Sequence, residues 1–314
     1  MRRRNVILLA GLAAASGLLT ACGGGDDDAP APLPDVVQLA QANPDLSILV
    51  EAVIAADLTA TLKGAGPFTV FAPNNAAFAA LLGELNLTKA QLLADKPLLT
   101  AVLTYHVLAG KVERAQIPLG KAISTVQGGV FKIDANGAVL TITDGRNRKP
   151  AILATDIQAG NGVVHVVDRV LLPADRNIVQ TAQALPQFSI LVEAVVAANL
   201  QGTLSGTGPF TVFAPTNDAF AALLAELGVS KAALLANTAL LTRVLTYHVV
   251  PGRVLQAEIP VGSNIATVQG TTLRVNADLT ITDQRSRSSK IIATDVLTSN
   301  GVVHAIDRVI LPAA

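Results

Sequence analysis

Residues 67–73 read Pro-Phe-Thr-Val-Phe-Ala-Pro, and the same seven residues recur without a change at 209–215. The two copies lie 142 positions apart, since 209 − 67 = 142. The branched and aromatic residues at 68–71 predict a short buried strand. Asn74, and Thr216 in the second copy, follow the closing proline and predict a helix N-cap. Each copy therefore places a buried strand directly before a helix.

Two further segments recur in the same order. Leu-Thr-Tyr-His-Val at 103–107 returns at 245–249, again 142 positions later because 245 − 103 = 142. Asn-Gly-Val-Val-His at 161–165 returns at 300–304, where the offset is 300 − 161 = 139. Three residues were therefore gained or lost in between, most simply at 135–138. That segment reads Ala-Asn-Gly-Ala and is typical of a hairpin turn, where insertions cost least.

A repeat of this length has the size of a whole domain, so we predict domain 1 at residues 33–173 and domain 2 at residues 174–312. Almost no linker separates them, which favours a packed boundary. Within each copy helical spacing comes first, as at 46–53, and Pro97 suits the first turn of a helix ending near Thr104. After that point the pattern changes to short strands with turns, predicted at 130–134, 139–143, 151–155 and 163–167. The fold class is therefore α+β, with helices packed on a mainly antiparallel sheet or sandwich.

Composition excludes several kinds of function. The chain has 23 Lys and Arg against 23 Asp and Glu, and no Trp, so it lacks both the basic field and the stacking platforms that nucleic-acid binding uses. It has one cysteine, which allows neither an internal disulfide nor a cysteine-based zinc site. We therefore expect no nucleic-acid partner and no cofactor.

The N-terminal residues resemble an export signal. Three arginines precede an apolar run at 6–19, which fits a signal-peptide core and is too short to span a membrane. The run ends Leu-Thr-Ala before Cys22, which resembles the bacterial lipobox. That resemblance implies a signal peptide at 1–21, lipid on Cys22 and membrane anchoring. The Gly, Asp and Pro residues at 22–32 predict a flexible tether. The alternative is an ordinary signal peptide that happens to end beside a cysteine.

The repeated motifs resemble those of the fasciclin domain. The first family signature is similar to residues 69–78 and 211–220, and the second is similar to residues 162–173 and 301–312. The family's Tyr-His motif matches the Tyr-His pairs at 105–106 and 247–248. The resemblance covers nearly all of the chain after the tether. It implies two fasciclin-like domains, each a wedge-shaped β-sandwich with helices packed along it.

The resemblance also implies adhesion or extracellular recognition, and in animal members the Tyr-His region has been linked to integrin binding. We therefore take as candidate ligand contacts Tyr105, His106, Tyr247 and His248. We expect both histidines to lie in an apolar strand. The alternative role is structural: a buried imidazole that bonds to the backbone and ties a helix end to the sheet. The same alternatives apply to His165 and His304.

Two loops concentrate positive charge in a chain with few charges elsewhere. The basic residues are Arg146, Arg148, Lys149, Arg285, Arg287 and Lys290. They could contact an anion, such as a polysaccharide or an acidic partner, and two weak sites on one anchored chain would gain avidity. The alternative is a solvated turn that aids solubility.

The sequence therefore predicts a lipid-anchored envelope protein that binds an extracellular protein or polysaccharide in adhesion. We expect it at the outer membrane or periplasmic face rather than the inner membrane, because Gly23 follows Cys22 where an Asp would favour inner-membrane retention. One alternative is a structural envelope protein without a specific ligand. Another is a hydrolase, suggested by Thr, Asp and His residues around His165 and His304, but no nucleophile elbow, phosphate loop or metalloprotease helix accompanies them. We predict no catalytic and no metal-binding residues.

Overall fold

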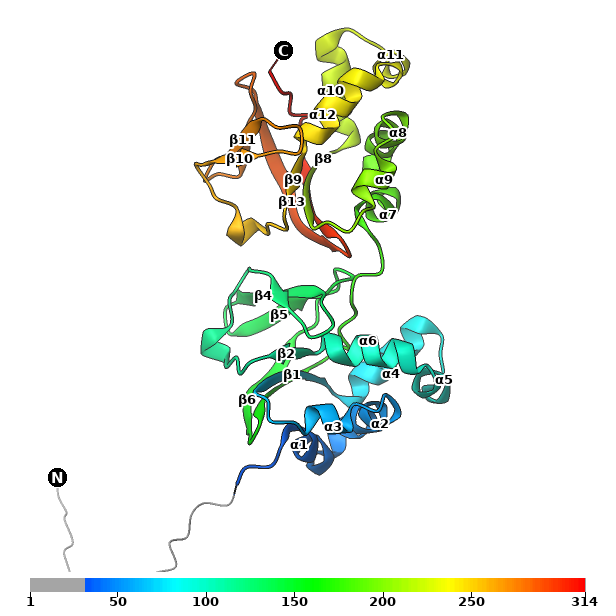
Figure 1. Cartoon of the computed structure of the whole chain (residues 1–314), viewed down its shortest axis with the longest axis vertical. Helices are drawn as coiled ribbons and strands as arrows, with labels where there is room; N and C mark the ends of the chain where they lie inside the picture. The colour runs from blue at the N-terminus through cyan, green and yellow to red at the C-terminus, as the bar shows by residue number, and fades with distance from the viewer. Residues whose placement is uncertain (1–31, 314) are drawn as a thin grey trace, which may run out of the picture. The chain divides into compact units, whose positions relative to one another are not determined.

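The computed structural model describes residues 32–313 (Figure 1). The predicted signal peptide, the predicted lipidation site Cys22 and the predicted tether as far as residue 31 lie outside the described residues. Among the helices that are described, none combines the length and the apolar character that crossing a membrane requires.

Domain 1 begins with helices, as the sequence predicts. Their bounds are α1 (Val36–Ala42), α2 (Ser47–Ala55), α3 (Thr59–Leu62), α4 (Asn75–Leu85), α5 (Lys89–Ala94) and α6 (Lys96–Tyr105). Asn74 caps α4, because its side chain accepts a hydrogen bond from the backbone of Ala77 at 2.8 Å. Pro97 lies in the first turn of α6, where its missing N–H costs nothing. Both predictions of helix starts are confirmed.

The strands of domain 1 form two sheets. They are β1 (Phe68–Pro73), β2 (Val107–Ala109), β3 (Ile123–Ser124), β4 (Val130–Asn136), β5 (Val139–Thr143), β6 (Ile152–Ala159) and β7 (Gly162–Val167). One sheet has the order β2-β1-β7-β6 and the other the order β3-β4-β5. Most neighbours are antiparallel, but β1 and β7 pair in parallel through all six residues of each. Gly137, with φ +60°, lies in the turn between β4 and β5 where the sequence predicts one.

The four-stranded sheet separates two apolar cores. Val70 and Ala72 point to one face of β1 and pack against the helices, while Phe71 points to the other face. There Phe71 meets Phe131 of β4 edge to face, with ring centroids 5.1 Å apart. Helices therefore cover one face of this sheet (Figure 1), and the three-stranded sheet covers the other as a sandwich.

Domain 2 repeats this plan. Its helices are α7 (Ile178–Gln183), α8 (Ser189–Ala197), α9 (Gln201–Leu204), α10 (Asn217–Leu227), α11 (Lys231–Ala236) and α12 (Thr238–Tyr247). Its strands are β8 (Phe210–Pro215), β9 (Val249–Pro251), β10 (Asn264–Ala266), β11 (Thr272–Val275), β12 (Thr280–Thr282), β13 (Ser288–Thr298) and β14 (Gly301–Ile306). Because β12 pairs with the start of β13, all seven strands join in the order β10-β11-β12-β13-β14-β8-β9. The predicted α+β class is thus confirmed for both repeats.

One asparagine in each domain ties together segments far apart in the sequence. The side chain of Asn161, between β6 and β7, accepts a hydrogen bond from the N–H of Val36 at 3.0 Å. The same side chain donates to the carbonyls of Leu62 and Gly64 at 2.8 and 2.9 Å. Asn300 makes the equivalent three bonds in domain 2. We call this side chain the asparagine clamp; it fixes the first helix and the end of the third to the sheet.

The next residue, Gly162, lies against the backbone of β1. A Cβ at this position would come within 2.1 Å of the carbonyl oxygen of Phe68. The parallel pairing of β1 and β7 therefore requires glycine here, and Gly301 meets the same restriction in domain 2.

Candidate functional site

Both tyrosines of the Tyr-His pairs are buried. The hydroxyl of Tyr105 donates to the carbonyl oxygen of Val130 at 2.6 Å, and that of Tyr247 donates to the carbonyl oxygen of Thr272 at 3.0 Å. Burial raises the pKa of both phenols, to about 12 for Tyr247. Each tyrosine therefore connects the end of a helix to a strand across the core of its own domain, β4 in domain 1 and β11 in domain 2.

Both histidines of these pairs lie at the C-cap of a helix, and the expected strand position is wrong. The helix continues through Tyr105 because its apolar residues keep helical spacing against the core. The Nδ1 of His106 lies 2.7 Å from the carbonyl oxygen of Val102, and Nε2 accepts a hydrogen bond from the N–H of Leu171 at 2.8 Å. His248 makes the equivalent pair of contacts. Burial lowers the pKa of each imidazole to about 4, so both rings are neutral at pH 7.

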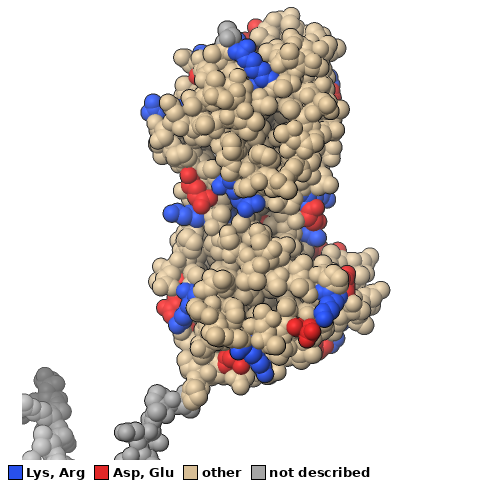
Figure 2. Space-filling model, in the orientation of Figure 1, with Lys and Arg blue, Asp and Glu red and all other residues tan. Residues whose placement is uncertain are grey.

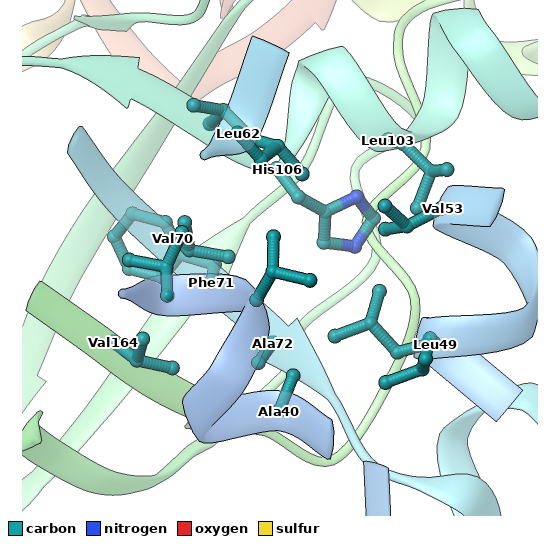
Figure 3. Close-up of a pocket in the computed structure, with 14 residues that line it drawn as sticks. Ala40, Leu49, Val53, Leu62, Val70, Phe71, Ala72, Leu103, His106 and Val164 are labelled. Carbon is teal, nitrogen blue, oxygen red and sulfur yellow. The ribbon is translucent and has the colours of Figure 1, made fainter. Parts of the chain in front are cut away.

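Figure 3 shows His106 at the edge of a small apolar cavity in domain 1. The cavity has a volume of about 40 Å³ and is lined by side chains such as Leu49, Val53 and Leu103. Domain 2 has an equivalent cavity of about 30 Å³ beside His248. Because both nitrogens of each ring already have backbone partners, neither ring offers a ligand a hydrogen bond. The structure thus shows an internal role for the Tyr-His pairs in detail, and ligand contact there stays a prediction.

The histidines of the two second signatures are also held by backbone. The Nδ1 of His165 accepts a hydrogen bond from the N–H of Asp156 at 3.2 Å, and its Nε2 lies 2.9 Å from the carbonyl oxygen of Val112. His304 repeats these contacts on β14. Asp168, another residue of the hydrolase alternative, accepts from the N–H of Ala151. The imidazole nitrogens are therefore engaged in structure, and within residues 32–313 no group of three or more His, Cys, Asp and Glu side chains could hold a metal ion.

The two arginines nearest the centre of the basic loops are held inside the protein. Arg148 pairs with buried Asp144 at 2.7 Å and with Glu84 at 2.9 Å. Arg287 makes the same contacts with Asp283 and Glu226. The carboxylate oxygens of Asp144 and Asp283 also accept backbone N–H groups of their own loops. These two arginines therefore shape the loops.

The other basic residues of the loops are more exposed. Arg146 pairs with Asp175 at 3.1 Å, and Arg285 donates to the carbonyl oxygen of Pro312. Lys149 and Lys290 are exposed, although the ammonium of Lys149 also bonds to Thr143. Figure 2 shows Lys and Arg scattered over a broad neutral surface on the face in view. An anion contact through these loops stays a prediction, and its exposed members are Lys149, Arg285 and Lys290.

Exposed aliphatic side chains recur at matching positions of the two repeats. Ile54 and Val126 in domain 1 are 58% and 51% exposed. Their counterparts Val196 and Val268, each 142 positions later, are 50% and 41% exposed. Two further pairs of exposed aliphatics also match in position, Leu119 with Val261 and Leu153 with Ile292. In the sequence these residues look like core residues; aligning the repeats finds the pairs, and only the coordinates show that they are exposed.

Val268 lines a groove beside α12 in domain 2, and we use the name α6/α12 groove for this surface together with the positions that match it around α6 in domain 1. In domain 2 the groove has a volume of about 740 Å³. One wall is residues 197–199, which directly follow Val196, and another includes Val268. Its floor is α12, which presents Thr242 and Thr246. In domain 1 an exposed ion pair between Lys96 and Asp57 occupies the matching positions.

A comparison with known families and proteins agrees with this geometry. The family model described as the Fasciclin domain matches residues 44–173 and 186–312. Transforming growth factor-beta-induced protein ig-h3 of Sus scrofa is 33% identical over 257 residues, which cover 80% of this chain and 35% of that protein. Protein sll1483 of Synechocystis is 45% identical over 150 residues, which cover 47% of this chain and 79% of that protein. The chain thus spans only 35% of the length of the first of these relatives.

Among solved structures, a FAS1 domain pair from the insect cell adhesion molecule fasciclin I covers 86% of this chain and 98% of its own. The sequence identity is 17% and the TM-score is 0.43. The family model matches both repeats, and the motifs that carry the match occupy the same strands and helix ends in each. The chain belongs to the fasciclin domain family.

Proposed function

We propose that this chain is a lipid-anchored protein of the bacterial envelope whose two fasciclin domains bind an extracellular or envelope ligand in adhesion. Cys22, preceded by an apolar run and small residues, supports the anchor. The family supports adhesion, because fasciclin-domain proteins are often related to adhesion or the extracellular matrix. The placement that follows is the outer membrane or the periplasmic face.

The observation that carries the binding role is the recurrence of exposed aliphatic side chains at the α6/α12 groove. Polar surface residues outside the groove have diverged between the repeats, as the exposed pair Lys63 and Ser205 shows. Ile54 and Val126 have nevertheless kept aliphatic counterparts. Burying one such side chain contributes roughly 1.5 kcal/mol or more, which is useful to a complex but not to the free domain.

The groove chemistry favours a hydrogen-bonding ligand such as a protein surface or a polysaccharide. In domain 2 the groove is lined by the amides of Asn199 and Gln269, by the threonine hydroxyls of α12 and by one cation, Arg243. The hydroxyls of Thr242 and Thr246 already donate to carbonyls one turn earlier in α12, so they remain as acceptors. A structural envelope protein without a ligand would gain no stability from keeping exposed aliphatic side chains at this surface in both repeats.

The test is attachment of a deletion strain complemented with variants of the full chain. The groove variant carries Ile54→Ser, Val126→Ser, Val196→Ser and Val268→Ser. A matched control carries Leu153→Ser and Ile292→Ser, which remove equally exposed aliphatics from β6 and β13 instead. We expect attachment to be lost in the groove variant and kept in the control. Normal attachment of the deletion strain itself would rule out adhesion.

The anchor has a separate test. Cys22→Ala should leave the protein unlipidated and released from the membrane fraction, measured by labelling with a radioactive fatty acid and by fractionation. If the variant takes up the label as the parent does, lipidation at Cys22 is wrong. Because the groove variant keeps Cys22, the two tests separate anchoring from binding.

A further inference from the structure

The outer face of β4 in domain 1 is covered by domain 2. Alternate residues of β4 fill the core of domain 1, so Val130 and Lys132 point away from that core. They are nevertheless only 8% and 9% exposed. The matching residues on β11 of domain 2, Thr272 and Arg274, are exposed. The same strand face is thus buried in one repeat and open in the other.

A buried ion pair joins the two domains at this face. The ammonium of Lys132 lies 2.7 Å from Oδ2 of Asp295 on β13, and the two side chains are 11% and 2% exposed. The second carboxylate oxygen of Asp295 accepts the N–H of Gln256 at 2.7 Å. Burial opposes the charged form of Lys132, but the hydrogen bonds to Asp295 and Asp134 outweigh it and raise its pKa. Both charges are therefore paired, and a buried pair of this kind fixes the alignment of the surfaces that carry it.

The loop between β5 and β6 adds a second polar contact. The side-chain amide of Asn147 accepts the N–H of Leu297 at 2.7 Å and donates to the carbonyl oxygen of the same residue at 3.0 Å. Because β12 pairs only with residues 288–290 of β13, one side of β13 is unpaired at Leu297, and Asn147 occupies that side as a neighbouring strand would. Asn147 adopts a left-handed conformation, with φ +62°, and its counterpart Ser286 has φ +59°. Serine has no amide, so domain 2 does not carry this contact group at its own free end.

Apolar residues complete the contact, and they differ between the repeats at the unpaired ends. Val130 clusters with Leu255, Leu297 and Val302. At the free end of domain 2, Thr272 replaces Val130. At the free end of domain 1 polar residues replace the two leucines. The full set of matched positions is Ala122 with Asn264, Val130 with Thr272, Leu255 with Glu113, and Leu297 with Gln158.

We propose that the hairpin face of domain 1 (Val130, Lys132 and Asn147) is a dedicated docking surface for the β13 edge of domain 2, and that the two free ends are polar so that no second copy docks there. The contact is heterologous, so complementary free ends would continue it into an open chain of molecules. The two repeats have diverged so that polar residues occupy the free ends, which prevents such a chain of molecules. The chain is then a closed pair, which holds its two halves at one fixed spacing, and this inference does not depend on the proposed function.

The test measures a distance between the domains in the chain without residues 1–22. Spin labels go on cysteines at the exposed positions Ala60 and Ala232, which are the only cysteines of that chain. The docking variant is Val130→Thr, Leu255→Glu and Leu297→Gln. Each new residue is the one found at the matching position of the other domain, so we expect each domain to keep its fold. NMR spectra of the backbone amides check that it does. We expect one narrow distance peak in the parent and loss of that peak in the variant.

A finer pair of variants isolates the asparagine contact. Asn147→Ala should broaden the peak, whereas Ser286→Ala, with the same backbone conformation at the free end, should not. A broad distribution in the parent, or an unchanged narrow peak in the docking variant, would overturn the proposal.

The converse experiment places docking residues at the free ends. The variant combines Glu113→Leu, Gln158→Leu, Asn264→Ala, Thr272→Val and Ser286→Asn, beside the retained charges of Asp156 and Arg274. Light scattering should give a mass that rises with concentration for this variant and stays at that of one chain for the parent. A parent that associates, or a variant that remains monomeric, would contradict the role assigned to the polar ends.

Discussion

Acidification should weaken this fold through its buried imidazoles, and His106→Gln should remove a defined part of the effect. His106 is held neutral because it is buried and Val102 and Leu171 occupy its two nitrogens. Its pKa is lowered to about 4, whereas in the unfolded chain it takes its ordinary value of about 6.5. The unfolded chain therefore binds the proton first as the pH falls. The stability carried by the neutral ring is complete above about pH 6.5 and is lost progressively down to about pH 4.

The magnitude follows from these two pKa values. Between about pH 7 and about pH 5 the free energy of unfolding should fall by about 2 kcal/mol for each such ring. His248 has the same pKa and the same contacts, so the two rings together should account for about 4 kcal/mol. Carboxylates also make the free energy of unfolding depend on pH, but their contribution cancels in the difference between parent and variant.

The assay is urea denaturation of the parent, His106→Gln and His248→Gln at several pH values across this interval. Each variant should be less stable at pH 7, by about 1–3 kcal/mol, because glutamine cannot satisfy both backbone groups in the same geometry. Each should also lose about 2 kcal/mol less than the parent on acidification. If a variant keeps the full pH dependence, or if the His106 ring titrates near pH 6.5 in the folded protein, the assignment of a structural role to the Tyr-His pair is refuted.

Other substitutions test packing and the contact between the domains. Gly162→Ala should destabilise the protein by about 3 kcal/mol, because the added methyl group meets the carbonyl oxygen of Phe68. The control Gly83→Ala, in α4 with open space around it, should stabilise the protein by about 0.5–1 kcal/mol. Equal melting temperatures for the two variants would contradict this prediction. Lys132→Met should lower the free energy of unfolding by about 3–5 kcal/mol, because it leaves the carboxylate of Asp295 buried and unpaired. Adding Asp295→Asn should recover part of this loss. If Lys132→Met is as stable as the parent in urea denaturation, the ion pair is open to water.

Much of the fold of each domain follows from the local pattern of the sequence. The strand at 68–73, the cap at Asn74 and the turn at Gly137 each depend on residues within a few positions of one another. The parallel pairing of β1 and β7 is different, because it joins segments far apart and no local pattern specifies it. His106 was misplaced for a related reason: an apolar helix end and an apolar strand start have the same composition.

The candidate surfaces were harder to predict than the fold. Val130 reads as an ordinary strand residue, and only the coordinates show that it faces the other domain. Ile54 and Val126 have the sequence pattern of core residues, and only their exposure in the structure distinguishes them from the core. Conversely, Arg148 reads as a surface charge, but buried Asp144 draws it inward. The residues that bury Val130 are distant in sequence, whereas Asp144 is only four residues from Arg148 and it is the burial of this carboxylate that the sequence does not show.

The asparagine clamp has a mechanical consequence. In a chain held by its N-terminus, a pulling force enters domain 1 at α1, where Asn161 passes it to the start of β7 through the N–H of Val36. Because β7 lies parallel to β1, a load along these strands shears all of their hydrogen bonds together instead of opening them one by one. Asn300 gives domain 2 the same entry point at α7. Each domain thus meets tension through the part of its sheet that is best arranged to resist it.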